Sequence, residues 1–135
     1  MSVLINIDVP DLGAGIAFYT AAFGLTVQRH LGDHVAELAG WSVPLFLLEK
    51  AAGTIGAGTN PRSYERHWTP VHLDVVVEDI DQAIKQAVAA GARLEHDVRT
   101  APWGKIAVVA DPFGHGFCVI QFLNRGYDEI ASAAG

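Results

Sequence analysis

The sequence contains a single cysteine, Cys118, among its 135 residues, so no disulfide can form within the chain. Basic residues are also few. The sequence has nine Lys and Arg and fifteen Asp and Glu, which give a net charge of -6 at pH 7. This balance argues against nucleic acid as a partner, since phosphate binding requires a stripe of Lys and Arg. No apolar run approaches the roughly 18 residues of a membrane span, and no charged-then-apolar leader segment opens the chain. We therefore expect a cytoplasmic protein with no membrane partner.

The composition that remains is that of a folded domain. Half of the residues are hydrophobic, and the chain length suits one domain, which we expect to span residues 1–135. An anionic ligand is not excluded, because local arginines can oppose the net negative charge.

A valine-rich segment followed by a capped helix organises the chain. Residues 71–77 predict a β-strand, and Asp79 is placed to cap a helix over 79–90. Side chains alternate along a strand, so His72, Asp74 and Val76 are predicted to share one face. An imidazole and a carboxylate on the same face of a buried strand need a partner or a polar function.

The same pattern occurs sixty-eight residues earlier. Strand residues 3–9 lead into Asp11, which is predicted to cap a helix to about Phe23, as 71–77 lead into Asp79. The sequence therefore contains an internal duplication, and its period implies two similar modules rather than a solenoid. Gly13 and Gly15 weaken the first helix intrinsically, which indicates close packing or a nearby ligand, or else has no structural cause, since glycines also occur at such positions by chance.

Each half reads as βαβββ. In the first module, at about 1–50, strands are expected at 25–31, 34–38 and 43–49 after the helix. A Gly-rich and then aromatic stretch at about 51–69 is either a strap that joins the modules or a lid. The second module, at about 70–123, adds strands 92–98, 103–110 and 116–122, with a tight turn at 111–116. Residues 124–135 are expected to form either a frayed tail or a short surface helix.

Three motifs carry a resemblance to a known family. They are "VHLDVVVEDIDQA" at 71–83, "AGAR" at 90–93 and "DPFGHGFCVI" at 111–120. Together with the duplication, they resemble the vicinal oxygen chelate superfamily, which includes glyoxalase I, extradiol dioxygenases and bleomycin resistance proteins, and most of all its glyoxalase-like domains. The resemblance implies an α+β fold in which two βαβββ modules form a curved eight-stranded mixed sheet with the helices outside. It also implies a homodimer.

Metal-dependent members of this superfamily hold a divalent ion through His and Glu on the first and last strands of each module. His72 matches one of these four positions. The other three positions carry Leu4, Cys118 and either Phe46 or Leu47, and Glu49 is reachable only if the strand register slips. We therefore expect no metal cofactor, and if a divalent ion does bind, His72, Glu49 and Cys118 are the expected ligands.

Simpler structural interpretations accompany these candidates. His72 is interpreted as a hydrogen-bonded core or pocket residue, a ligand contact or a metal ligand. Cys118 can instead be a small buried residue that behaves as an apolar one. Trp68 can instead pack against the strap. The remaining histidines on presumed edges and turns are expected to be solvated, namely His30, His34, His96 and His115.

Three classes of function remain. The first is a module that binds an apolar or aromatic small molecule in the cup of the sheet, where the expected contacts are His72, Asp74, Phe46, Trp68, Trp103, Phe113 and Cys118. The second is an enzyme, either a metal-dependent lyase, isomerase or dioxygenase that uses His72, or a metal-free catalyst with His72 and Asp74 as an acid–base pair. Glyoxalase I-like lyase and extradiol dioxygenase-like oxidoreductase chemistry are the enzymatic expectations. The third is a structural or regulatory protein. The missing ligands favour the first class.

Overall fold

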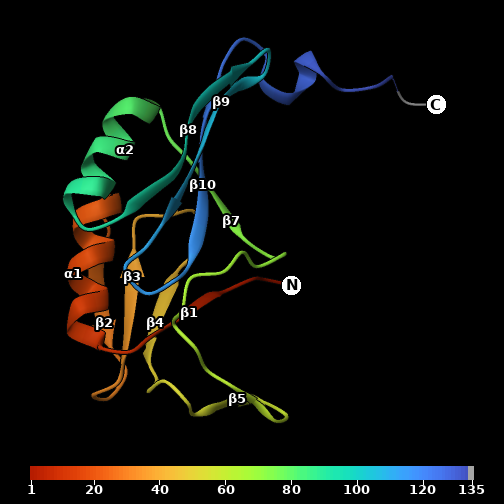
Figure 1. The fold of residues 1–135 in the computed structure, drawn as a ribbon. Helices are drawn as coiled ribbons and strands as arrows, with labels where there is room; N and C mark the ends of the chain where they lie inside the picture. Colours follow the sequence, from red (N-terminus) through yellow and green to blue (C-terminus); the bar gives the residue numbers. More distant parts are fainter. Residues whose placement is uncertain (134–135) are drawn as a thin grey trace. The chain divides into compact units, whose positions relative to one another are not determined.

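The computed structural model describes residues 1–133. The chain folds into two compact units, Met1–Arg66 and His67–Gly135. Each unit contains one helix and one mixed four-stranded sheet. The predicted α+β class and the duplicated βαβββ order are therefore confirmed (Figure 1). No helix in the described part of the chain is both long and apolar enough to cross a bilayer.

The first unit begins with β1 (Ile5–Val9) and α1 (Leu12–Phe23), which are followed by β2 (Thr26–His30), β3 (Val35–Ala39) and β4 (Leu45–Glu49). The sheet order is β1-β4-β3-β2, and β1 is parallel to β4 whereas the other pairs are antiparallel. The helix begins where predicted, because the Asp11 side chain accepts a hydrogen bond from the Ala14 N–H at 2.7 Å.

Gly15 explains how closely α1 approaches its sheet. A Cβ atom at this position would lie 3.0 Å from Val9 Cγ2 and 3.4 Å from Leu47 Cδ1. The close packing inferred from the sequence is therefore present at Gly15. At Gly13 the nearest atom to such a Cβ would be Asp11 Oδ1 at 3.4 Å, which is an ordinary contact.

The stretch after β4 is more ordered than a plain strap. It contains two short paired strands, β5 (Ile55–Ala57) and β6 (Asn60–Pro61). Arg62 ties it to β1 through a 2.8 Å ion pair with Asp8, and the Tyr64 hydroxyl donates to the Lys50 carbonyl at 2.6 Å. Residues 51–66 therefore belong structurally to the first unit.

The second unit repeats the arrangement with β7 (Leu73–Val76), α2 (Ile80–Ala89), β8 (Arg93–Ala101), β9 (Gly104–Ala110) and β10 (Gly116–Phe122). Its sheet order is β7-β10-β9-β8, and β7 and β10 form the parallel pair. The Asp79 side chain caps α2 by accepting from the Gln82 N–H, as predicted. A 3₁₀ turn, η1 (Gly126–Glu129), lies in the predicted tail.

Several predicted strands differ from the structure in their extent, and one of these differences concerns a candidate site residue. The strand expected at 71–77 covers only Leu73–Val76, so His72 precedes it rather than lying within it. The register with β10 starts at Leu73, opposite Phe117. The Val71 carbonyl accepts instead from the Thr69 hydroxyl at 3.0 Å, so this part of the backbone has a local partner.

Candidate functional site

The sheet of the second unit has one face toward α2 and one face away from it. The Gln121 side chain accepts a 2.9 Å hydrogen bond from the N–H of Ile80, the first residue of α2, so Gln121 points to the helix. Alternation along β10 then places Phe117 and Val119 on that face and Cys118 and Ile120 on the other. We call the face that carries Cys118 the site face.

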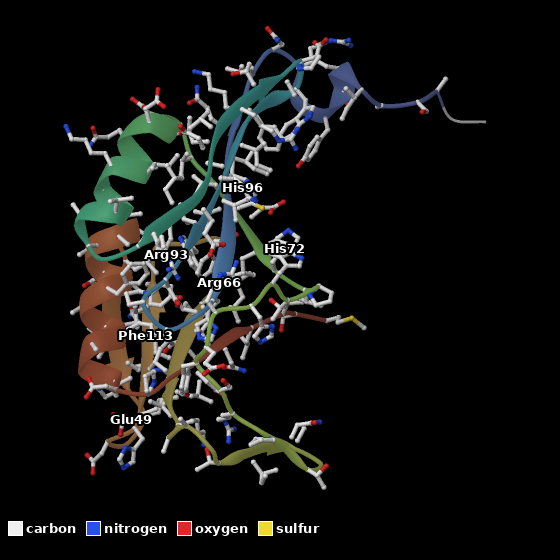
Figure 2. All side chains as sticks on the ribbon, in the orientation of Figure 1. Glu49, Arg66, His72, Arg93, His96 and Phe113 are labelled. Atoms are coloured by element: carbon white, nitrogen blue, oxygen red, sulfur yellow. The ribbon has the colours of Figure 1, made fainter. Side chains whose placement is uncertain are left out.

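Three polar side chains meet on the site face. Cys118 on β10 is the register partner of Asp74 on β7, and His72 Nε2 lies 3.4 Å from Asp74 Oδ1. The potential ligand atoms of His72, Asp74 and Cys118 all lie within 4.8 Å of one another. His72 and Asp74 are exposed whereas Cys118 is buried, so the cluster has an open side. Figure 2 labels His72 beside β7.

Trp68 extends this cluster. Its ring centroid lies 4.6 Å from that of His72 at an interplanar angle of 47°, and the Trp68 side chain is half exposed. A tilted aromatic contact at this distance restricts the imidazole orientation. The structure therefore joins four of the predicted site residues, namely Trp68, His72, Asp74 and Cys118.

The Cys118 thiol is held in its protonated form. Burial raises its pKa above the ordinary value of 9.0, and the nearby Asp74 carboxylate raises it further by charge and by accepting a hydrogen bond, while Arg99 acts in the opposite direction. A thiol with a raised pKa is a poor nucleophile near neutral pH. The site therefore offers an imidazole and a carboxylate as its polar groups, beside a neutral thiol.

The same cluster has the donors that a divalent ion would need. Three protein ligands are the usual number for a catalytic zinc site, and His, Asp and Cys are all zinc ligands. Binding would require Cys118 to lose its proton, which burial and Asp74 both oppose. His72, Asp74 and Cys118 thus fit a metal by number and type, and the protonation of the thiol opposes it.

Basic residues on β8 also occupy the site face. His96 pairs with Val108 on β9, and Val108 pairs with Cys118, so His96 lies in the same row as Cys118 and Asp74. The next row joins Arg99, Ile106, Ile120 and Val76. Two register shifts in β8, between Leu94 and His96 and between His96 and Arg99, make this possible. His96 is exposed, in agreement with the expectation that it is solvated, and Arg99 is not among the predicted site residues. Residues three apart in a regular strand face opposite sides, so the sequence pattern does not indicate that His96 and Arg99 share a face.

The other predicted site residues are described by their own neighbours. Phe46 lies on β4 of the first unit, opposite Asn6. Trp103 packs with Phe122 and Tyr127, at centroid distances of 6.3 and 5.1 Å. Phe113 is buried in the turn between β9 and β10, where its N–H donates to Asp111.

Glu49 has partners within the first unit. Its Oε2 accepts from the Leu12 N–H at 2.8 Å, and its Oε1 lies 2.8 Å from His34 Nδ1. The carboxylate thus stabilises the first turn of α1. His34 was expected to be solvated, but its ring contacts the Glu49 carboxylate. His72 pairs with Asp74 in the second unit.

Comparison with known proteins assigns the family. The model of the glyoxalase-like domain matches residues 4–120. The chain belongs to this family. A protein of Mycobacterium bovis with no assigned function is 37% identical to this glyoxalase-like protein over 137 residues, which cover 95% of this chain and 88% of that one. The anthracycline biosynthesis protein DnrV of Streptomyces peucetius is 30% identical over 134 residues, which cover 96% of this chain and 44% of that one. The glyoxalase-like chain thus spans less than half the length of this curated relative.

Solved structures support the same fold. The fosfomycin resistance protein FosX of Listeria monocytogenes aligns with a TM-score of 0.70 at 16% identity, covering 91% of this chain and 93% of that one. TioX from a Micromonospora species aligns with a TM-score of 0.66 at 18% identity, covering 91% and 99%. The resemblance to the vicinal oxygen chelate superfamily is therefore confirmed at the level of fold.

Proposed function

We propose that this glyoxalase-like protein binds a flat, largely apolar aromatic molecule on the site face, with His72 as the polar anchor. The observation that carries the proposal is the His72–Asp74 pair, whose atoms lie 3.4 Å apart on an open face. Asp74 can accept a hydrogen bond from the Nε2–H of His72 and so orient the other ring nitrogen toward a ligand. Trp68 beside His72 offers an aromatic surface against which a flat ring can stack.

The surroundings of this pair suit an apolar ligand. Val76 on β7 is exposed, and Ile106 and Val108 on β9 are half-buried on the same face. Burying apolar ligand surface against such side chains contributes roughly 25 cal/mol per Å². The relationship to proteins named for anthracycline biosynthesis supports a polycyclic aromatic ligand class. The contacts predicted for Phe46, Trp103 and Phe113 stay predictions.

A ligand screen tests this proposal. Anthraquinones, an anthracycline and smaller aromatic metabolites would be screened by tryptophan fluorescence and thermal shift. A ligand present at 100 times its dissociation constant should stabilise the protein by about 2.7 kcal/mol. His72→Ala should weaken binding by about 0.5–1.5 kcal/mol, the value of a neutral hydrogen bond. Trp68→Ala should weaken it through lost stacking.

His30→Ala is the matched control, because His30 is an exposed histidine on β2 of the first unit. It should leave binding unchanged. The proposal fails if no compound shifts the melting temperature. It also fails if the hits bind to His72→Ala and to Trp68→Ala as tightly as they bind to the unmodified protein.

The alternative of a divalent-metal-dependent lyase, isomerase or dioxygenase is favoured by one observation, the convergence of His72, Asp74 and Cys118. A bound ion would supply Lewis-acid stabilisation of an anionic oxygen. We nevertheless expect protein purified without an affinity tag or added metal to hold less than stoichiometric zinc, nickel, manganese or iron. Elemental analysis tests this expectation, and stoichiometric metal that is lost in both His72→Ala and Asp74→Asn would show that the cluster binds an ion, as the alternative requires.

A further inference from the structure

The unexplained feature of the site face is its basic edge. Strand β8 lies at the edge of the sheet, and Arg93, His96 and Arg99 are all exposed residues on it. Arg93 pairs with Ala110, which pairs with Gly116. These residues form a row across the sheet, next to the row on the same face that contains His96. The side chains of Arg93 and His96 are labelled in Figure 2.

These three residues reach one face only because β8 is irregular. They are spaced three apart, and a regular strand would send the middle side chain to the helix face. Each of the two register shifts inserts one residue on β8 and restores the same orientation. The result is a line of three nitrogen donors on an otherwise acidic protein of net charge -6.

The donors on this line are available to a ligand. Among the residues that the structure describes, the Arg93 and Arg99 side chains form no hydrogen bond and no ion pair with a carboxylate. An arginine presents a planar set of donors that matches carboxylates and related oxyanions. The charge of Arg99 lowers the pKa of the Cys118 thiol, in agreement with the register that places both residues on the site face.

The rows also fix where the charge lies relative to the proposed anchor. His96 and Asp74 stand at opposite ends of a four-strand row with Val108 and Cys118 between them. Neighbouring strands are about 4.8 Å apart, so the row is about 14 Å across. An anionic group at β8 is therefore separated from the Asp74 carboxylate, and an apolar ring system can lie between the two ends.

We propose that the ligand carries an anionic oxygen group, a carboxylate or an ionised phenol, which Arg99 and His96 bind at the β8 edge of the site face. This inference rests on the proposed function, because it names the substituent that an aromatic ligand presents opposite His72. Arg99 supplies the charge and His96 a hydrogen bond. Arg93, one row further along, adds longer-range attraction.

A matched pair of compounds tests the inference. Anthraquinone-2-carboxylate and anthraquinone-2-carboxamide have the same ring system and differ in charge. Their dissociation constants would be measured by fluorescence quenching at 50 and 300 mM salt. We expect the carboxylate to bind about tenfold more tightly at low salt, with the difference shrinking at high salt. Arg99→Gln should remove most of the difference, because it should weaken binding of the carboxylate much more than binding of the carboxamide.

Lys105→Gln provides the control. Lys105 lies on β9 opposite Gln121, on the helix face, so the substitution removes one positive charge from the same sheet without touching the site face. It should retain the preference for the carboxylate. Either of two results would overturn the inference and leave the proposed function intact. The first is that the two compounds bind to the unmodified protein with equal affinity. The second is that Lys105→Gln and Arg99→Gln reduce the preference for the carboxylate equally.

A titration with benzoate separates the two proposals. Benzoate is a single aromatic ring with a carboxylate, and its binding would be followed by backbone amide shifts in NMR spectra. Shifts confined to the neighbourhood of His96 and Arg99, together with no binding of either anthraquinone, would support the anion site and refute the polycyclic ligand. The absence of shifts at both residues would overturn the anion site, whatever the anthraquinones do.

Discussion

Cys118 lies directly opposite Asp74 in the parallel pair of β10 and β7, and the Asp74 carboxylate raises the pKa of the Cys118 thiol by its charge and by hydrogen bonding. The two residues belong to strands whose sequence positions lie far apart, and the register alone brings them together. Because the carboxylate disfavours the thiolate, this relationship determines the chemistry of the only cysteine in the chain.

Alkylation of Cys118 should therefore be slow in the folded protein. Burial and Asp74 both raise the pKa of the thiol, so little thiolate is present at pH 8. Asp74→Asn removes one of these causes, and we expect it to lower the thiol pKa and accelerate alkylation. The rate with iodoacetamide would be followed by mass spectrometry from pH 7 to 10. Asp97→Asn, on β8, serves as the charge-matched control. A rate equal to that of the unfolded protein would contradict the prediction.

The two glycines near the start of α1 should respond oppositely to alanine. Gly13→Ala should stabilise the protein by about 0.5–1 kcal/mol, because helix propensity improves and the new Cβ meets only an ordinary contact. Gly15→Ala should destabilise it by about 1 kcal/mol, because the Cβ would press on Val9 and Leu47. Urea denaturation of the two variants measures both effects. Equal stabilisation by both substitutions would show that α1 can move away from its sheet at no cost.

Glu49 should make the stability of the protein depend on acid pH. The Leu12 N–H, and then His34, lower the pKa of the Glu49 carboxyl below its ordinary value of 4.5. A group with a depressed folded-state pKa stabilises the protein above its unfolded value, and this contribution is lost as the pH falls through the folded value. The loss should therefore start near pH 4.5 and continue below it.

Glu49→Gln removes this titration. The variant should be less stable than the unmodified protein at pH 7, and the difference should narrow as the pH falls from 5 toward 3. Melting temperatures across this range provide the measurement. Glu78→Gln, an exposed carboxylate just before α2, is the control and should leave the pH profile unchanged. A difference that stays constant with pH would refute this role.

We expect the protein to be a homodimer in solution. Strand β7 is an edge strand with one described neighbour, β10, and the adjoining Val71 is 89% exposed. Exposed apolar edge strands are prone to pair with another chain. Light scattering at micromolar concentration should give twice the monomer mass of 14.4 kDa.

Val71→Lys should reduce the dimer mass to that of the monomer. Ile130→Lys replaces another exposed apolar residue, after η1, and should leave the dimer intact. A monomeric unmodified protein would remove the dimer prediction without affecting the fold.

The duplicated modules and both helix caps were predictable from the sequence because their causes are local. Asp11 and Asp79 each stand before an apolar helical pattern, and each cap depends on atoms within three residues. That His72 and Asp74 share one side of the sheet likewise follows from strand alternation, although the strand begins only at Leu73 and, contrary to expectation, both residues are exposed. The family could be recognised from the motifs for the same reason, since short contiguous segments carry them.

The composition of the site was decided by pairing between distant strands. Cys118 joins Asp74, and Glu49 joins Leu12, through contacts that span 44 and 37 positions of sequence. The basic edge required more, because Arg93, His96 and Arg99 share a face only where β8 carries two extra residues against β9. Such irregularities arise from the fit of one strand to its neighbour, and a period-two pattern read along a single strand contains no record of them.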